Sequence, residues 1–181
     1  MKHIYLVGKA GSGKDTIADY LINQYGYKQL RFAKGVYNYA YKYFNMSPNE
    51  KDRKLLQGIG KCFRDEIDIN YWLNMVGKQL VESTQPCIVT DCRFLNEHVY
   101  LKERGAIGIG IQVDINTRLN RLTKRDGSTQ LNTLSDVSET EMDIYFDDLK
   151  YYIDNNGDLK STFKAIDDLM VELGVSKWLK I

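Results

Sequence analysis

Residues 4–16 read IYLVGKAGSGKDT, and this stretch decides the fold. Its first four residues are apolar and predict a buried strand, and a glycine-rich turn follows them directly. Lys14 comes next, and apolar residues then recur at helical spacing from Ile17 onward. A strand, a glycine loop that ends in a lysine, and a helix together form the frame of a phosphate-binding P-loop.

The chemistry of this stretch favours a nucleoside triphosphate as ligand. Glycines let backbone N–H groups curl around a polyphosphate, and the start of a helix adds positive partial charge. A strict P-loop has Ser or Thr directly after its lysine, whereas this chain has Asp15 there and Thr16 one place later. A glycine turn without a ligand is the alternative, which the agreement of loop, lysine and flanking elements disfavours. The expected nucleotide-binding residues are Gly8, Ala10, Gly11, Ser12, Gly13, Lys14, Asp15 and Thr16.

Length and composition limit the classes of protein that this chain can be. Its 181 residues suffice for one sizeable domain but not for two ordinary ones. The formal net charge of +1 does not suggest a nucleic-acid partner. Three cysteines without metal-binding spacing predict reduced thiols in a cytoplasmic protein. No apolar run approaches the length of a membrane span, so no membrane partner is expected.

Further strands are expected near residues 28–32, 87–91, 107–113 and 149–153, with helices between them. This alternation predicts an α/β fold, a three-layer core around a five-stranded parallel sheet. Residues 34–82 read as a helical insert between two of the strands. Ligands of such sheets bind beyond the carboxyl ends of the strands, where the P-loop and Asp91 are both expected.

Asp91 is the candidate magnesium ligand. A carboxylate that ends a strand beside a P-loop commonly serves Mg²⁺, and Asp15 is expected to share that role or to orient a water molecule. The alternative for Asp91 is a cap on the helix that follows, because Asp is a good N-cap residue.

Arginines further along the chain are candidates for handling the transferred phosphoryl group. Arg93, two residues after Asp91, either clamps a phosphate or pairs with Glu97. A predicted helix over 115–125 carries basic residues at three- and four-residue spacing on one face, which is either a solvated face or a source of charge for the reaction. These last candidates are Arg118, Arg121 and Arg125.

With these motifs in place, the chain resembles the deoxynucleoside monophosphate kinases of bacteriophages, a branch of the nucleoside monophosphate kinases. The matching stretches run in the family's order along most of the chain. They are Ser12-Gly13-Lys14-Asp15-Thr16 with Ala18-Asp19, Gln57-Gly58-Ile59-Gly60, Asp68 with Trp72, Thr90-Asp91-Cys92-Arg93-Phe94 with Asn96-Glu97, Ser138-Glu139, and Ile153 with Asn155-Asn156-Gly157. An aspartate after the P-loop lysine is normal in this family, whereas Asp136 stands where the family often has His.

The resemblance implies transfer of the γ-phosphoryl group of ATP, with Mg²⁺, to a small-molecule acceptor, a deoxynucleoside monophosphate. It implies that residues 34–82 bind the acceptor, that a lid lies near 118–140, and that a phage-encoded enzyme would work in the host cytoplasm. A homodimer is one open assembly state. Residues 155–157 are expected at the nucleotide, and the expected acceptor-binding residues are Lys34, Arg53, Gln57, Arg64, Trp72, Arg93, Ser138 and Glu139.

Two other readings remain open. A dephospho-coenzyme A kinase shares the core and a basic helix like Arg118–Arg125, although the Asp-x-Arg-Phe stretch and the Ser-Glu pair argue against it. A regulatory NTPase, driven by its nucleotide to change conformation, belongs to a different class. The long helical insert and the basic helix argue against that second reading.

Overall fold

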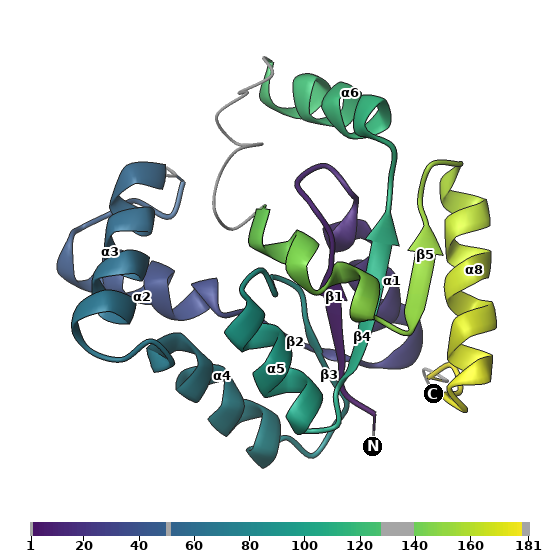
Figure 1. Ribbon diagram of the computed structural model, residues 1–181, viewed down its shortest axis with the longest axis horizontal. Coiled ribbons are helices and arrows are strands. Elements are labelled where there is room, and N and C mark those ends of the chain that lie inside the picture. Colours follow the sequence, from purple (N-terminus) through teal and green to yellow (C-terminus); the bar gives the residue numbers. More distant parts are fainter. Residues whose placement is uncertain (1, 50–51, 128–139, 179–181) are drawn as a thin grey trace. The chain divides into compact units, whose positions relative to one another are not determined.

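The computed structural model describes residues 2–49, 52–127 and 140–178 (Figure 1). The chain divides into two compact units. The core unit comprises Met1–Gln29 and Gln85–Ile181, and the helical unit comprises Leu30–Thr84. The boundaries of the helical unit lie a few residues outside the insert expected over 34–82.

The core unit is built on a five-stranded sheet in the order β2-β3-β1-β4-β5. Its pairs β1–β3, β1–β4 and β4–β5 are all parallel, and the predicted α/β fold with a five-stranded parallel sheet is confirmed. All four residues of the central strand β1 are buried, as expected for a parallel strand covered on both faces. The strands are β1 (Ile4–Val7), β2 (Lys28–Leu30), β3 (Cys87–Val89), β4 (Ile107–Gln112) and β5 (Tyr151–Asp154).

Helices cover both faces of this sheet, which gives three layers. Figure 1 shows α5 in front of the sheet and α1 behind it. Behind it, Ile4 and Leu6 of β1 share one apolar core with residues of α1 and α8, whereas Tyr5 points to the other face and contacts His98 of α5. The elements are α1 (Lys14–Tyr25), α5 (Leu95–Glu103), α6 (Ile115–Asp126), α8 (Leu159–Glu172) and the short 3₁₀ helices η2 (Glu141–Ile144) and η3 (Phe146–Asp148).

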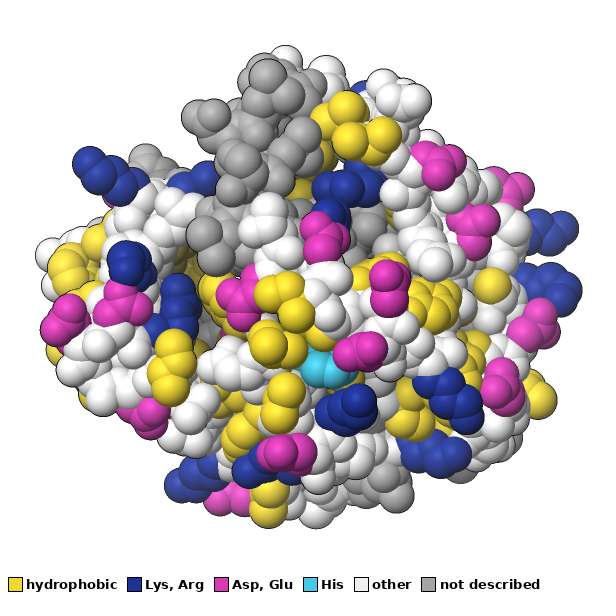
Figure 2. Space-filling view, in the orientation of Figure 1, with side chains coloured by type: hydrophobic (Ala, Val, Ile, Leu, Met, Phe, Trp, Pro, Cys, Tyr) yellow, Lys and Arg dark blue, Asp and Glu magenta, His cyan; other side chains and the backbone are white. Residues whose placement is uncertain are grey.

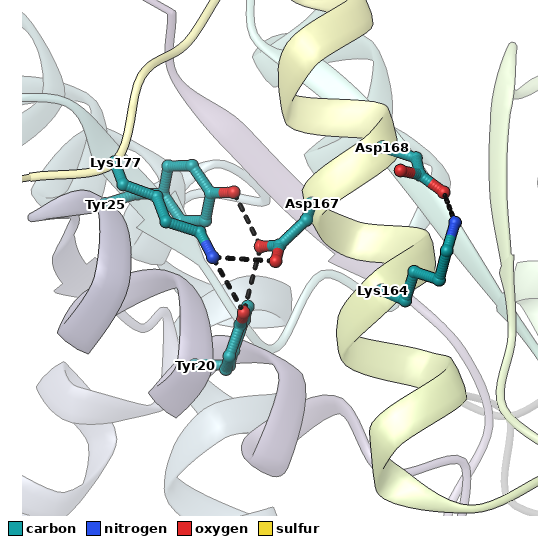
Figure 3. A network of polar contacts seen from close by, with 6 residues as sticks. All are labelled: Tyr20, Tyr25, Lys164, Asp167, Asp168 and Lys177. Carbon is teal, nitrogen blue, oxygen red and sulfur yellow. Dashed lines mark hydrogen bonds and ion pairs between the residues drawn. The ribbon is translucent and has the colours of Figure 1, made fainter.

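A polar network joins α1, α8 and the segment that follows α8 (Figure 3). Asp167 of α8 accepts hydrogen bonds from the hydroxyls of Tyr20 and Tyr25 at 2.9 and 2.7 Å, and from Lys177 at 2.7 Å. Burial acts to raise the pKa of Asp167, but the bonds from Lys177 and the two tyrosines hold it below its ordinary value. The network therefore fixes α8 against α1, and α8 is in turn linked through Asn155 to the glycine loop described below.

The helical unit has an apolar core of its own. It contains α2 (Ala33–Tyr43), α3 (Arg53–Glu66) and α4 (Tyr71–Glu82). Trp72 is 4% exposed, and its indole N–H donates to the carbonyl of Gly60 at 3.1 Å. Gly35 of α2 lies so close that a Cβ there would be 2.7 Å from the Trp72 ring. The indole is therefore the centre about which these helices pack.

Two glycine substitutions test this packing. Gly35→Ala should lower the free energy of unfolding by about 1–3 kcal/mol, because the added methyl overpacks the Trp72 ring. Gly58→Ala on α3 is the matched control, since nothing lies within 4 Å of its added methyl. That change should raise stability by about 0.5–1 kcal/mol through helix propensity. Urea unfolding of both variants gives the comparison, and equal effects would contradict the packing described here.

Candidate nucleotide-binding site

The glycine loop lies between the carboxyl end of β1 and the start of α1. Gly11 and Gly13 have φ angles of 80° and 88°, a left-handed conformation that side chains other than glycine's adopt only with strain. Gly13 is the N-cap residue of α1, and no side chain caps the helix there. The N-cap residue therefore offers no side-chain acceptor to the first N–H groups of α1, and helix N-termini commonly bind anions through these groups.

Two neighbouring elements approach this loop closely enough to require glycine. A Cβ on Gly11 would lie 2.8 Å from the carbonyl oxygen of Arg118 on α6. A Cβ on Gly13 would lie 2.4 Å from the side-chain nitrogen of Asn155, the residue after β5. Glycine at these positions of the motif therefore allows α6 and Asn155 to pack against the loop, and it also allows a phosphate to approach the backbone.

The predicted basic helix is α6, and its N-terminal half lies against this loop. Arg118 is 9% exposed, and its Nε donates to the carbonyl of Ala10 at 2.9 Å. Arg121 donates through Nη2 to the carbonyl of Asn155 at 2.8 Å. Arg125 is exposed one turn further on. Of the three expected arginines, Arg118 thus contacts the loop and Arg121 contacts Asn155 beside it. The helix that carries them lies beyond the carboxyl end of β4 (Figure 1).

Two buried polar atoms at the loop have no hydrogen-bond partner among the described residues. They are the Ser12 hydroxyl and Nη1 of Arg121. The hydroxyl lies 2.8 Å from the position of a Cβ on Gly8, and Nη1 lies 3.9 Å from that on Gly13. Buried polar groups in native proteins are nearly always paired, so such groups beside the N-terminus of a helix indicate a polar, anionic ligand.

The lysine of the motif reaches across the loop. Its ammonium donates to the carbonyl of Gly8 and, at 3.3 Å, to that of Lys9. Asp15 and Thr16 follow in the first turn of α1, and both are exposed. The residues expected at a nucleotide within 8–16 are therefore contiguous around one loop.

Asp91 and Arg93 follow β3 at the same edge of the sheet. β3 pairs with β1 with Val89 opposite Tyr5, and continuing this register places Asp91 opposite Val7, directly before the loop. Between the two lies Cys92, whose thiol is fully buried. Burial raises the pKa of this thiol, and the charges of Glu97 and Asp91 act in the same direction.

The turn after Asp91 is held by Glu97. This buried carboxylate accepts hydrogen bonds from the backbone N–H groups of Arg93 and Phe94 at 2.7 and 3.0 Å. Helix α5 begins at Leu95 with Phe94 at the N-cap, so Asp91 lies three residues before the cap. This geometry disfavours the role of a helix cap for Asp91.

The expected Asn155-Asn156-Gly157 turn follows β5. Asn155 is 4% exposed, and its side chain bonds to the protein on both sides, as described below. Asn156 and Gly157 are exposed, and the side-chain oxygen of Asn156 accepts from the N–H of Asp114 at 2.8 Å. This turn therefore ties β5 to the start of α6.

Several contacts at this edge carry no signal in the sequence. Lys9 pairs with Asp143 of η2 at 2.6 Å, and Glu141 of the same short helix accepts from the N–H of Leu95 at 2.8 Å. Thr162 of α8 bonds to Asn155. The first two contacts join segments far apart in the chain, and their partners Asp143 and Glu141, like Thr162, belong to no recognisable motif.

The expected acceptor residues lie on the helical unit or outside the described residues. Trp72 belongs to the core of that unit. On α3, Arg53 and Gln57 are exposed, and Arg64 is half-buried, with Nη1 3.4 Å from the Cβ position of Gly60. Lys34 is exposed on α2. Ser138, Glu139 and the 128–139 part of the expected lid lie outside the described residues.

Acidic and basic side chains are interspersed over the face that Figure 2 shows. Within residues 2–49, 52–127 and 140–178, no three His, Cys, Asp or Glu side chains gather in a way that could hold a metal ion. In the same part of the chain, no helix has the length and apolarity needed to cross a membrane.

The fold and the loop together define the class: a P-loop nucleotide-binding fold. Among solved structures, the chain is similar to TT1252 from Thermus thermophilus, with a TM-score of 0.66 and 16% identity over 96% of this chain and 99% of that one. It is similar to shikimate kinase from Acinetobacter baumannii in complex with shikimate (TM-score 0.60, 20% identity, 96% and 94% covered). A third similar structure is a gluconokinase from Sinorhizobium meliloti, with a TM-score of 0.56 and 15% identity over 96% of this chain and 95% of that one. At these identities the likeness shows the fold alone.

No protein-family model matches the chain, and no curated protein matches it significantly in sequence. The acceptor must therefore be argued from the site itself.

A buried cluster that joins β1 to α5 predicts a pH dependence of stability. The Tyr5 hydroxyl contacts Nδ1 of His98 at 3.1 Å, and the Tyr145 ring stacks on His98 with centroids 4.5 Å apart. Burial lowers the pKa of His98 below 6.5, with Lys102 acting in the same direction and Asp148 against it. The unfolded chain therefore takes up the proton first, and stability falls as the pH drops below about 6.5.

We expect the urea midpoint to decrease between about pH 7.5 and pH 5.5, and this decrease to be shallower in His98→Gln. His3, whose pKa burial also lowers, provides the matched comparison as His3→Gln. The quantity compared is the slope with pH, because either variant also loses a hydrogen bond at every pH. An unchanged slope in His98→Gln would remove His98 from this effect.

Proposed function

We propose that this protein is an ATP-dependent kinase that transfers the γ-phosphoryl group of ATP to a deoxynucleoside 5′-monophosphate. The observation that carries the proposal is the pair of buried, unpartnered polar atoms, Ser12 Oγ and Arg121 Nη1, beside the uncapped start of α1. A polyphosphate supplies acceptor oxygens for the backbone N–H groups and the guanidinium at once. The fold shared with kinases supports this reading as an analogy.

In this proposal the phosphates are held by residues 8–16, and Lys14 and the α6 arginines supply positive charge. Phosphoryl transfer spreads negative charge over the oxygens of the migrating group, so fixed cations at the loop lower the barrier. Arg118 and Arg121 are already oriented by backbone carbonyls, which reduces the entropy lost when they bind phosphate. Arg93 and Arg125 are proposed to add charge to the same group.

The described residues also fit a magnesium ion that arrives with the nucleotide. Mg²⁺ neutralises phosphate charge and usually keeps several ligands from water and phosphate oxygens, so it needs few protein carboxylates. Asp91, opposite the end of β1, and Asp15 are the residues proposed to hold it, directly or through water. The Thr16 hydroxyl is a third oxygen at the same turn.

The deoxynucleoside monophosphate is proposed to bind through the helical unit. On α3, Arg53, Gln57 and Arg64 recur at four- and seven-residue spacing and so share one face. Guanidinium groups and an amide suit the phosphate and the base of a nucleotide. The support for this substrate class is the resemblance of the sequence to the bacteriophage kinases.

An acceptor screen tests the proposal. The purified protein is given ATP and Mg²⁺ with each deoxynucleoside monophosphate in turn, with dephospho-coenzyme A, or with no acceptor. ADP should form rapidly with one or more of the deoxynucleoside monophosphates. It should form slowly with dephospho-coenzyme A and without an acceptor. Lys14→Ala, the matched control, should lose at least about a hundredfold in turnover, because the lysine meets charge that grows in the transition state.

Other results of the screen have definite meanings. Transfer only to dephospho-coenzyme A would replace the proposed acceptor with that one. ADP formation at the same rate without acceptor would assign a nucleotide-driven regulatory protein instead. Turnover of Lys14→Ala within about tenfold of wild type would exclude this loop as the catalytic phosphate site.

Asp91→Asn should slow transfer and raise the Mg²⁺ concentration needed for half-maximal rate by about tenfold or more, because one anionic ligand is lost. ATP binding should change less than the rate. Asp19→Asn, which removes an exposed carboxylate from α1, is the control and should leave the Mg²⁺ titration unchanged. If both variants titrate as the wild type does, Asp91 has no part in the metal site.

A further inference from the structure

Asn155 links the phosphate loop to two other elements through its side chain. Its Nδ2 donates to the carbonyl oxygen of Ser12 at 2.8 Å, and its Oδ1 accepts from the hydroxyl of Thr162 at 2.7 Å. Both bonds are buried, and Asn155 and Thr162 are 4% and 1% exposed. The backbone of Asn155 is also fixed, since its N–H donates to Gln112 of β4 at 3.0 Å.

The orientation of the Asn155 amide follows from the chemistry of its two partners. The Ser12 carbonyl can only accept, so the amide nitrogen must face it. The amide oxygen then faces Thr162, whose hydroxyl can donate. The reversed amide would set two carbonyl oxygens against each other in a buried place, which is costly. The Ser12 carbonyl therefore selects the orientation of the amide, and the Thr162 hydroxyl, which also lies 3.1 Å from the carbonyl oxygen of Asp158, supports that orientation by its bond to the amide oxygen.

Holding the Ser12 carbonyl also sets the direction of a phosphate-binding donor. In a planar trans peptide, the carbonyl oxygen and the next N–H point in opposite directions. Because the Ser12 oxygen points to Asn155, the N–H of Gly13 points away from Asn155. Gly13 is the N-cap of α1, so this N–H is among the donors that a helix start offers to an anion.

The same residue sets the place of Arg121. The Asn155 carbonyl accepts from Nη2 of Arg121 at 2.8 Å, and the other guanidinium nitrogen, Nη1, lies 3.9 Å from the Cβ position of Gly13. The side chain and the backbone of Asn155 thus position a loop donor and a cation beside the same glycine.

We propose that Asn155 and Thr162 are positioning residues that hold the phosphate loop in the shape that binds the nucleotide. Asn155 acts through its bonds to the protein, and the inference rests on the proposed function only in taking the loop's ligand to be ATP or ADP. Their effect should appear in nucleotide affinity and leave the acceptor affinity unaffected, because Asn155 contacts the loop proposed to bind the phosphates and Thr162 contacts Asn155.

Thr162→Val tests the proposal, since it removes the hydroxyl at nearly constant volume. Calorimetric titration with ADP and Mg²⁺ should show about tenfold weaker binding, the size expected when a buried hydrogen bond is lost. The KM for ATP should rise by a similar factor, while kcat and the acceptor KM stay within about threefold. Thr162→Ser, which keeps the hydroxyl, should restore the affinity to within about twofold of wild type.

Ser161→Ala is the matched control. It removes a hydroxyl from the adjacent, exposed position of α8, where Ser161 donates to Asp158 at 2.8 Å. Its ADP affinity should equal that of the wild type. If Thr162→Val fails to fold, Asn155→Asp replaces the donor that faces Ser12 with a carboxylate oxygen, and it should weaken ADP binding by more than about tenfold.

The outcomes separate this inference from the function. Folded Thr162→Val or Asn155→Asp protein with wild-type ADP affinity would overturn the positioning role, even if its melting temperature fell. Wild-type protein that binds ADP but phosphorylates no deoxynucleoside monophosphate would overturn the proposed function and leave the positioning role to be decided by the variants. Wild-type protein that binds neither ADP nor ATP would overturn both.

Discussion

The close approach of Asn155 to Gly13 is the constraint on which the arrangement of the phosphate loop depends. A Cβ on Gly13 would lie 2.4 Å from the Asn155 amide, so the contact exists only because the residue is glycine. Through this contact β5 and α8 hold the loop from one side, while α6 holds it through the bond from Arg118 to Ala10. The loop is therefore fixed by tertiary packing from three elements beyond its own strand and helix.

The central strand makes this packing consistent with the rest of the fold. Because β1 is flanked by β3 and β4, the residues after each strand meet at one edge of the sheet. The glycine loop follows β1, Asp91 follows its hydrogen-bonded neighbour β3, and Asn155 follows β5, the next neighbour of β1 on the other side. On the rear face, Asp167 and two tyrosines fix α8 to α1, so the element that carries Thr162 cannot shift independently of the helix that begins at Lys14.

The sequence predicts the parts of this structure that depend on local pattern. The run at 4–7, the glycine loop and the apolar spacing that follows are local, and the five-stranded sheet follows from the alternation of elements. Element ends are less predictable: the strand expected over 149–153 is Tyr151–Asp154, since Leu149 is the C-cap of η3 and the strand begins two residues later. Trp72 shows a further limit of prediction from the sequence. An aromatic side chain can bind a ligand or belong to the core, and the sequence does not distinguish the two until its neighbours are known.

The contacts that shape the candidate site could not be predicted in this way. The partners in Lys9–Asp143 and Asn155–Ser12 are separated by more than a hundred residues, and only the tertiary fold brings them together. The basic helix illustrates the consequence. Its spacing suggested one face acting on a ligand, but Arg118 is fixed to the loop backbone, while Arg125 on the same helix is exposed.

The division into two units suggests why a shared fold says little about the acceptor. The helical unit has its own core around Trp72, Leu56 and Val36, so its exposed residues can change without disturbing the phosphate loop. Substitutions at exposed positions away from caps and cores usually cost little stability. Proteins that share the loop and sheet can therefore differ in acceptor, as the names shikimate kinase and gluconokinase show for two similar structures. We therefore expect the residues that select the acceptor on the polar face of α3, and the residues that act on the phosphates around Gly13.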